Sequence, residues 1–95
     1  MKYFYVYILK CSDGSYYVGH TDDLENRLHE HYTGTVPCYT SKRLPVKLVY
    51  NECFSTRDEA FTVERQIKKW SRKKKESLIK QRWSKLSEHA KKKFD

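Results

Sequence analysis

The chain has 95 residues, a length that suits one small domain. Charged residues make up 34% and hydrophobic residues 38%, while 15% are aromatic, including eight tyrosines. This aromatic content argues against disorder, because disordered chains are poor in aromatic residues. There is no apolar run of about 18 residues, which excludes a membrane-spanning helix. The N-terminal residues alternate like a strand and do not resemble a signal peptide, so we expect a basic cytoplasmic protein.

The net charge of +8 is concentrated in the last third of the chain. Residues 1–64 carry seven basic and nine acidic side chains, whereas residues 65–95 carry 13 basic and three acidic ones. Such an asymmetry indicates a polyanionic partner, either a nucleic acid or an anionic membrane surface. A lysine-rich helix that only keeps the protein in solution would give the same pattern.

The three cysteines do not suggest a structural cross-link. Cys11, Cys38 and Cys53 are odd in number and none forms a C-x-x-C pair, so neither a disulfide framework nor a zinc site is expected. Reduced thiols are the default for such a chain in the cytosol.

The first two predicted strands form a β-hairpin. Residues 3–10 alternate in character, which is typical of a strand, and a turn and a second strand follow. A three-residue loop with Gly14 in the left-handed conformation would pair Tyr7 with Gly19. Tyr7 and Tyr17 would then share one face of the sheet, whereas a two-residue loop would place them on opposite faces. Such a pair could serve stability alone, as cross-strand tyrosines often do.

The whole pattern predicts one α+β domain. Elements in the order ββαβαα favour a small three-stranded antiparallel sheet flanked by helices. Residues 1–80 are expected to form this domain, and residues 81–95 a basic helical extension packed on it. Asp22 is expected to cap the first helix and Gly34 to end it. The expected strands cover residues 3–10, 16–18 and 46–53, and the expected helices cover residues 22–32, 57–70 and the segment from 71 onward.

One carboxylate is predicted to lie on an apolar helix face. Glu64 is four residues after Ala60 and three before Ile67, on the face that should meet the sheet. A buried carboxylate is costly unless it is paired or binds a metal. An ion pair with Lys68 and a functional role as metal ligand or base are both compatible with this position.

Arg27 and His31 are neighbours on the first predicted helix. They are four residues apart and border its apolar stripe. An ordinary surface arrangement, with Arg27 paired to Asp23 and His31 at the edge of the core, would explain both.

Together these residues resemble the GIY-YIG nuclease superfamily. Tyr5-Val6-Tyr7 and Tyr17-Val18-Gly19 are similar to the two motifs that name it, with Tyr5 in place of the first glycine and valine in place of isoleucine. Arg27, His31 and Glu64 then follow in the family's order and spacing. The resemblance covers roughly residues 3–80 and is strongest to short single-domain bacterial members. An asparagine that many family nucleases carry after the glutamate helix has no counterpart here.

The resemblance implies metal-dependent hydrolysis of phosphodiester bonds in DNA, by an endonuclease or nickase. Glu64 would bind one divalent cation, Mg²⁺ or Mn²⁺, and Arg27 would stabilise negative charge on the phosphate. Tyr7 or Tyr17 would accept a proton from the attacking water or orient it, and His31 would position the water or relay the proton. A tyrosine has an ordinary pKa of about 10, so a basic role needs a neighbouring cation.

A further set of residues is expected to hold the nucleic-acid backbone. Phosphate contacts bind without reading bases, which favours nonspecific or structure-dependent cleavage, for example of branched or flapped DNA in repair or recombination. RNA is a further candidate substrate, and a protein partner could supply specificity. The expected phosphate-binding residues are His20, Lys42, Arg43, Lys68, Lys69, Arg72, Lys73, Lys74 and Lys75.

Two other functions fit the same sequence. The fold could serve as a non-catalytic nucleic-acid-binding module within a larger complex, because a fold does not fix an activity. The C-terminal helix, with Trp83 and Phe94, could instead bind a membrane surface.

Overall fold

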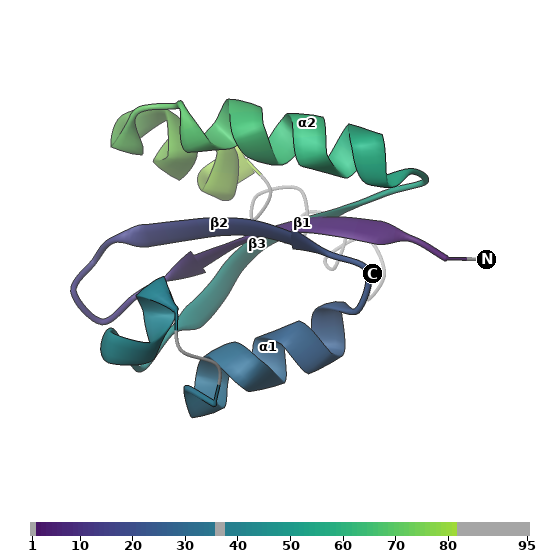
Figure 1. The fold of residues 1–95 in the computed structure, drawn as a ribbon. Coiled ribbons are helices and arrows are strands. Elements are labelled where there is room, and N and C mark those ends of the chain that lie inside the picture. Colours follow the sequence, from purple (N-terminus) through teal and green to yellow (C-terminus); the bar gives the residue numbers. More distant parts are fainter. Residues whose placement is uncertain (1, 36–37, 82–95) are drawn as a thin grey trace, which may run out of the picture.

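A three-stranded antiparallel sheet lies between helices on both of its faces (Figure 1). The computed structural model describes residues 2–35 and 38–81. In space the strand order is β2-β1-β3, so β1 is central and β2 is an edge strand. The strands are β1 (Phe4–Lys10), β2 (Tyr16–Thr21) and β3 (Lys47–Phe54). The helices are α1 (Leu24–Thr33), the short 3-10 helix η1 (Tyr39–Lys42), α2 (Arg57–Lys68) and a further helix over residues 72–81.

This architecture confirms the predicted α+β class and the order ββαβαα. The helix η1 is an addition, because the expected strands and helices leave its segment without regular structure. The proposed division at residue 80 stays a prediction, since residues 82–95 lie outside the described residues. Among the described residues, no helix combines the length and the apolar character that crossing a membrane requires.

The hairpin register is the one that the three-residue loop predicts. Tyr7 pairs with Gly19 and Leu9 with Tyr17. The loop is closed by a hydrogen bond of 2.8 Å from the Cys11 N–H to the Ser15 carbonyl, and Gly14 has a φ of 86°. Gly14 supplies the left-handed conformation that such a loop needs.

The alternation of β1 divides the core into two layers. On one face Val6 and Ile8 pack with Tyr50 and with Ala60 and Ile67 of α2. On the other face Tyr7 and Leu9 pack with Cys11 and Val46, and with side chains of α1 and β2. Figure 1 shows α2 and α1 on opposite sides of the sheet. Alternate residues of β1 and β2 therefore contact different helices: one set faces α2 and the next faces α1.

The ends of α1 and α2 are fixed by local side chains. Asp23, and not Asp22 as predicted, caps α1, because its carboxylate accepts a hydrogen bond from the Asn26 N–H. Asp22 instead forms an ion pair of 2.9 Å with Lys2. Gly34 ends α1 in the left-handed conformation, as predicted. Thr56 caps α2 by accepting from the Glu59 N–H.

The hairpin turn holds two later segments of the chain. The Ser12 N–H donates to the Arg43 carbonyl at 2.9 Å, and the Arg43 side chain donates to Asp13 at 3.1 Å. Arg72, at the start of the helix over 72–81, donates to the Gly14 carbonyl at 2.6 Å. The segment of η1 and the last described helix are thus both attached to one turn.

Candidate active site

Tyr7 and Tyr17 lie together on the α1 face of the hairpin. Their ring centroids are 6.3 Å apart. The Tyr7 ring extends over Gly19, since a β-carbon added at Gly19 would lie 2.6 Å from Tyr7 Oη. Glycine is therefore required at this position by the close approach of the phenol, and the hydroxyl reaches toward the edge strand β2.

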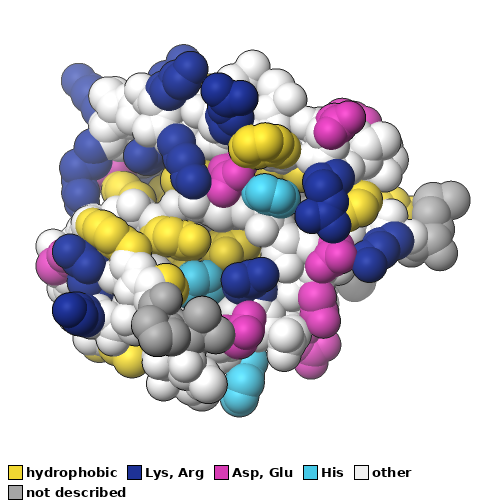
Figure 2. All heavy atoms as spheres, viewed as in Figure 1, with side chains coloured by type: hydrophobic (Ala, Val, Ile, Leu, Met, Phe, Trp, Pro, Cys, Tyr) yellow, Lys and Arg dark blue, Asp and Glu magenta, His cyan; other side chains and the backbone are white. Residues whose placement is uncertain are grey.

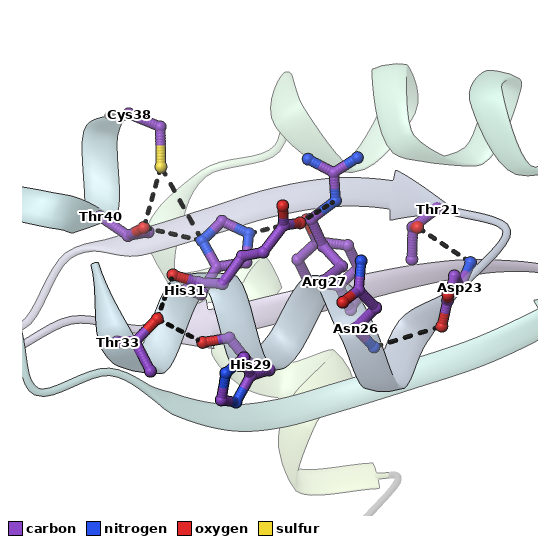
Figure 3. A network of polar contacts seen from close by, with 11 residues as sticks. Thr21, Asp23, Asn26, Arg27, His29, His31, Thr33, Cys38 and Thr40 are labelled. Carbon is purple, nitrogen blue, oxygen red and sulfur yellow. Dashed lines mark hydrogen bonds and ion pairs between the residues drawn. The ribbon is translucent and has the colours of Figure 1, made fainter. Parts of the chain in front are cut away.

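A chain of polar contacts extends from Tyr7 into the η1 segment, and Figure 3 labels its members His31, Thr40 and Cys38. Tyr7 Oη lies 3.0 Å from His31 Nε2, and His31 Nδ1 lies 2.7 Å from Thr40 Oγ1. Thr40 Oγ1 lies 3.1 Å from Cys38 Sγ. The side chains of Tyr7, His31 and Thr40 are all buried, with exposed fractions of 2%, 4% and 0%. Because these three side chains are sealed from solvent, their polar groups must find partners within the protein.

Burial decides the protonation states of Tyr7 and His31. Burial, and next the neighbouring Tyr17, raise the pKa of Tyr7 well above its ordinary value of 10.0, and Arg27 lowers it only in part. Burial, and next the positive charge of Arg27, lower the pKa of His31 below its ordinary value of 6.5. At neutral pH the protein therefore holds a neutral phenol against a neutral imidazole.

Arg27 presents a largely free guanidinium beside this chain. Its closest carboxylate is Glu30, with 3.6 Å between Arg27 Nε and Glu30 Oε1, rather than the expected Asp23. The side chain is 46% exposed, and in Figure 3 it points away from the body of α1 toward the sheet edge. It is placed to donate to an anion at that edge.

Glu64 lies on the opposite face of the sheet, in α2. Only 8% of its side chain is exposed, and both carboxylate oxygens have partners. Oε2 accepts from His20 Nδ1 at 2.8 Å and Oε1 lies 3.3 Å from Lys68 Nζ. The expected ion pair with Lys68 is therefore present, together with a second contact from β2. The His20 ring also stacks on Phe61 at 5.5 Å between centroids, which fixes its orientation.

The two sets of residues meet at the β2 edge. Tyr7, Arg27 and His31 approach from the α1 side, and Glu64 and His20 from the α2 side. Burial is the main cause of the raised pKa of Tyr7, and the negative charge of Glu64 adds a smaller contribution from across the strand. Figure 2 shows histidine and hydrophobic side chains gathered in the band between α2 and α1, with basic side chains around them.

The same residues carry a family signature. A family profile described as the GIY-YIG catalytic domain matches residues 3–77. The chain belongs to the GIY-YIG nuclease superfamily. The residues of the candidate site just described all lie within this match, and the predicted family membership is confirmed.

Relatives and solved structures agree with this assignment. The chain is 51% identical over 75 residues to a UPF0213 protein of Bacillus pumilus, which covers 79% of this chain and 76% of that protein. It is 50% identical over 76 residues to a UPF0213 protein of Haloquadratum walsbyi, covering 80% and 85%. The solution NMR structure of a UPF0213 protein from Bacillus halodurans has a TM-score of 0.56 at 42% identity, covering 82% of this chain and 83% of that one. That of an E. faecalis protein has a TM-score of 0.60 at 45% identity, covering 85% and 86%.

The donor set around Glu64 of this GIY-YIG domain suits a hard divalent cation. The described residues contain no group of three or more histidine, cysteine, aspartate or glutamate side chains that could enclose a metal. Mg²⁺ commonly accepts one or two protein carboxylates and takes its other ligands from water and substrate phosphate. Glu64 offers one carboxylate at the sheet edge, with the His20 ring beside it. The residues present thus fit such a cation when it arrives with the substrate.

Seven of the nine expected phosphate-binding residues separate into two groups in the structure, while His20 contacts Glu64 and Lys42 ends η1. Arg43 and Arg72 have structural partners: Arg43 donates to Asp13 and to the Tyr39 carbonyl, and Arg72 donates to the Gly14 carbonyl and lies over the Tyr16 ring. The lysines at the C-terminal end of α2 and in the segment that follows form a basic surface, in which Lys68 contacts Glu64; Figure 2 shows basic side chains above the central band. This surface consists of Lys68, Lys69, Lys73, Lys74 and Lys75.

Three residues that touch the site were not predicted. Thr40 and Cys38 extend the chain from His31, and Phe61 supports His20. Thr40 and Cys38 come from a segment between two prolines that has neither strand nor helix periodicity. For Phe61 the sequence held a usable signal, because an aromatic residue three positions before Glu64 lies next to it on a helix. In the structure Phe61 is exposed.

Proposed function

We propose that this GIY-YIG protein hydrolyses phosphodiester bonds in DNA with one divalent cation, Mg²⁺ or Mn²⁺. The observation that carries the proposal is the position of two different groups at one sheet edge. A buried phenol–imidazole pair stands on one side of Gly19, and a buried carboxylate, Glu64, stands on the other. A pair that moves a proton and a carboxylate that holds a cation are what hydrolysis of a phosphodiester requires.

The protonation states support Tyr7 as the residue that receives the proton of the attacking water. With its raised pKa, Tyr7 is not ionised beforehand. Its own proton passes to His31 Nε2, 3.0 Å away, as Oη accepts the proton of water. Tyr17 has no such acceptor described beside it. Its ring lies between His31 and Tyr39, with centroid separations of 5.2 Å and 6.2 Å, which suits a role in holding the rings in place.

Arg27 and Glu64 act on the phosphate group. Arg27 donates to the non-bridging oxygens, where negative charge increases as the water oxygen attacks; such donors are worth about 3 to 4 kcal/mol in related chemistry. Glu64 holds the cation, with His20 orienting the carboxylate. When bound, the cation supplies charge neutralisation at the leaving oxygen. The basic surface after α2 holds the DNA backbone without reading its sequence, which favours nonspecific or structure-dependent cleavage.

The test is plasmid nicking and flap cleavage with Mg²⁺ or Mn²⁺. The wild-type chain should nick in a metal-dependent manner, and Glu64→Ala and Arg27→Ala should each lose about 100-fold or more in rate. Arg57→Ala is the matched control, because it removes an arginine of the first turn of α2 that pairs with Asp22, and it should retain activity. Full cleavage by Glu64→Ala with metal present would overturn the proposal.

One observation favours a second function, a DNA-binding module without turnover. Both Glu64 oxygens already have partners, so a cation must displace Lys68, His20 or both. A module of this kind would bind DNA with a strong salt dependence and would not cleave under any divalent cation. The nicking assay with parallel binding measurements distinguishes the two functions.

A further inference from the structure

Thr40 is fully buried behind His31, in a segment that otherwise lies at the surface. Its hydroxyl stands between His31 Nδ1 and Cys38 Sγ, at 2.7 Å and 3.1 Å (Figure 3). A hydroxyl has a single proton to donate and can accept at its lone pairs. Whether Thr40 donates to His31 Nδ1 or accepts from it therefore depends on which neighbour receives the Thr40 proton.

Cys38 Sγ offers the Thr40 proton an acceptor other than His31 Nδ1. At the start of η1 the Ser41 N–H donates to the Cys38 carbonyl at 3.1 Å, and the Cys38 sulfur lies 3.1 Å from Thr40 Oγ1. Burial alone would raise the pKa of the Cys38 thiol, but hydrogen bonds from Thr40 and from the backbone of Thr40 and Ser41 bring it below its ordinary value. Cys38 Sγ also lies 3.9 Å from His31 Nδ1, so Thr40 Oγ1 is the closer partner of that nitrogen. A Thr40 proton directed at Cys38 leaves Thr40 Oγ1 to accept from His31, with the imidazole proton on Nδ1.

We propose that Thr40 is a positioning residue that keeps the proton of neutral His31 on Nδ1 and leaves Nε2 free to accept the Tyr7 proton. This rests on the proposed hydrolytic function. The opposite tautomer would place a proton on Nε2, directed at Tyr7 Oη, and Tyr7 could not then transfer its own. In triads where a third group fixes the histidine tautomer, losing that group costs far more than one hydrogen bond is worth.

The proton transfers balance in this arrangement. One water proton moves to Tyr7 Oη as the Tyr7 proton moves to His31 Nε2. The water oxygen forms a bond to phosphorus, and the bond from phosphorus to the leaving oxygen breaks with its electron pair. His31 becomes an imidazolium whose Nδ1–H still donates its hydrogen bond to Thr40 Oγ1. The positive charge therefore forms next to an acceptor that is already in place.

Thr40→Val tests the proposal, because it removes the hydroxyl and keeps the shape of the side chain. Two-bond proton–nitrogen NMR on the ¹⁵N-labelled full chain reports which His31 ring nitrogen carries the proton, without any need for activity. In the wild type we expect the proton on Nδ1. In Thr40→Val the Nε2-protonated form should appear, kcat for nicking should fall about 10- to 100-fold, and KM should change less than about threefold.

Thr40→Ser and Thr33→Val serve as controls. Thr40→Ser keeps the hydroxyl and should restore both the tautomer and kcat, whereas Thr33→Val makes the same exchange at an exposed position of α1 and should change neither. If Thr40→Val does not fold, Cys38→Ala at an exposed position removes the acceptor of the Thr40 proton and should also populate the second tautomer.

A wild-type His31 protonated on Nε2 would overturn the proposal. So would an unchanged tautomer in the folded Thr40→Val chain, or a changed tautomer with unchanged kcat. A wild-type chain that binds DNA without nicking it would overturn the hydrolytic function instead, and the ring NMR would still decide whether Thr40 fixes His31.

Discussion

The phenol of Tyr7 covers the α-carbon of Gly19, its partner across the β1–β2 pair. A β-carbon at Gly19 would lie 2.6 Å from Oη and 2.8 Å from Cζ of Tyr7, inside van der Waals contact. Gly19→Ala should therefore move the phenol away from His31. We expect a loss of about 1 to 3 kcal/mol in the free energy of unfolding and of about 100-fold in nicking rate. Urea unfolding and the plasmid assay measure the two effects.

The cause of that loss can be isolated with a double mutant. In a Tyr7→Ala background the two closest atoms are gone, so Gly19→Ala should cost much less in unfolding free energy. An equal cost in both backgrounds would show that Gly19 is required for a reason other than Tyr7.

The Glu64–Lys68 ion pair predicts a specific effect on metal requirement. Lys68 Nζ lies 3.3 Å from Glu64 Oε1, but its side chain is 54% exposed, so the pair is worth about 0.2 to 1 kcal/mol. Lys68→Met removes a cation that competes with Mg²⁺. The Mg²⁺ concentration at half-maximal nicking should then fall, by up to about fivefold.

Lys69→Met is the matched control for charge, because Lys69 is not an ion-pair partner of Glu64 in the described part of the chain. It should weaken DNA binding to a similar extent without lowering the Mg²⁺ midpoint. Equal midpoints in the two variants would show that Lys68 does not compete with the cation.

The lowered pKa of His31 predicts how activity and stability depend on pH. Between this pKa and the ordinary value of 6.5, the unfolded chain binds a proton that the folded protein does not. The free energy of unfolding should therefore decrease as the pH falls through 6.5 toward the lowered pKa, and this contribution is fully present above 6.5. Nicking should lose its proton acceptor only below pH 6.5. Urea unfolding and nicking rates from pH 5 to 8 measure both.

His31→Gln should flatten this part of the stability profile, while His29→Gln, at an exposed position of α1, should leave it unchanged. An acid limb of nicking centred above pH 6.5 would contradict the assigned role of neutral His31.

Much of the site is predictable because it follows from local periodicity. The loop residue Gly14 fixes the hairpin register, and the register places Tyr7 and Tyr17 on one face. The spacing of Glu64 from Ala60 and Ile67 predicts its burial, and both are confirmed. Such inferences require only the repeat of a strand or a helix.

The rest depends on contacts between segments that are distant along the chain. His20 meets Glu64 across 44 positions, and no periodic pattern predicts which distant side chain will contact a buried carboxylate. Thr40 gains its role only when η1 packs against α1. The choice between Asp22 and Asp23 as the cap of α1 also depends on a distant residue, because Lys2 forms an ion pair with Asp22.

Arg72 and Lys73 are adjacent and should behave differently. Arg72 donates to the Gly14 carbonyl at 2.6 Å and lies over the Tyr16 ring, whereas Lys73 is exposed. Arg72→Ala should lower the free energy of unfolding by about 1 kcal/mol. Lys73→Ala should leave stability unchanged and reduce the salt slope of DNA binding by about one. Thermal melts and binding titrations at several salt concentrations measure both; a larger stability loss for Lys73→Ala would contradict the assignment.

The attachments of the hairpin turn have a practical consequence for engineering. Exposed hairpin tips are usually the places where a chain accepts insertions, epitope tags or circular permutation. Here the tip at Ser12, Asp13 and Gly14 is hydrogen-bonded to Arg43 and Arg72. An insertion at this tip would detach the segment that delivers Thr40 to His31. Among the surface turns of this small domain, the tip of its first hairpin is thus a poor choice for a fusion or a label.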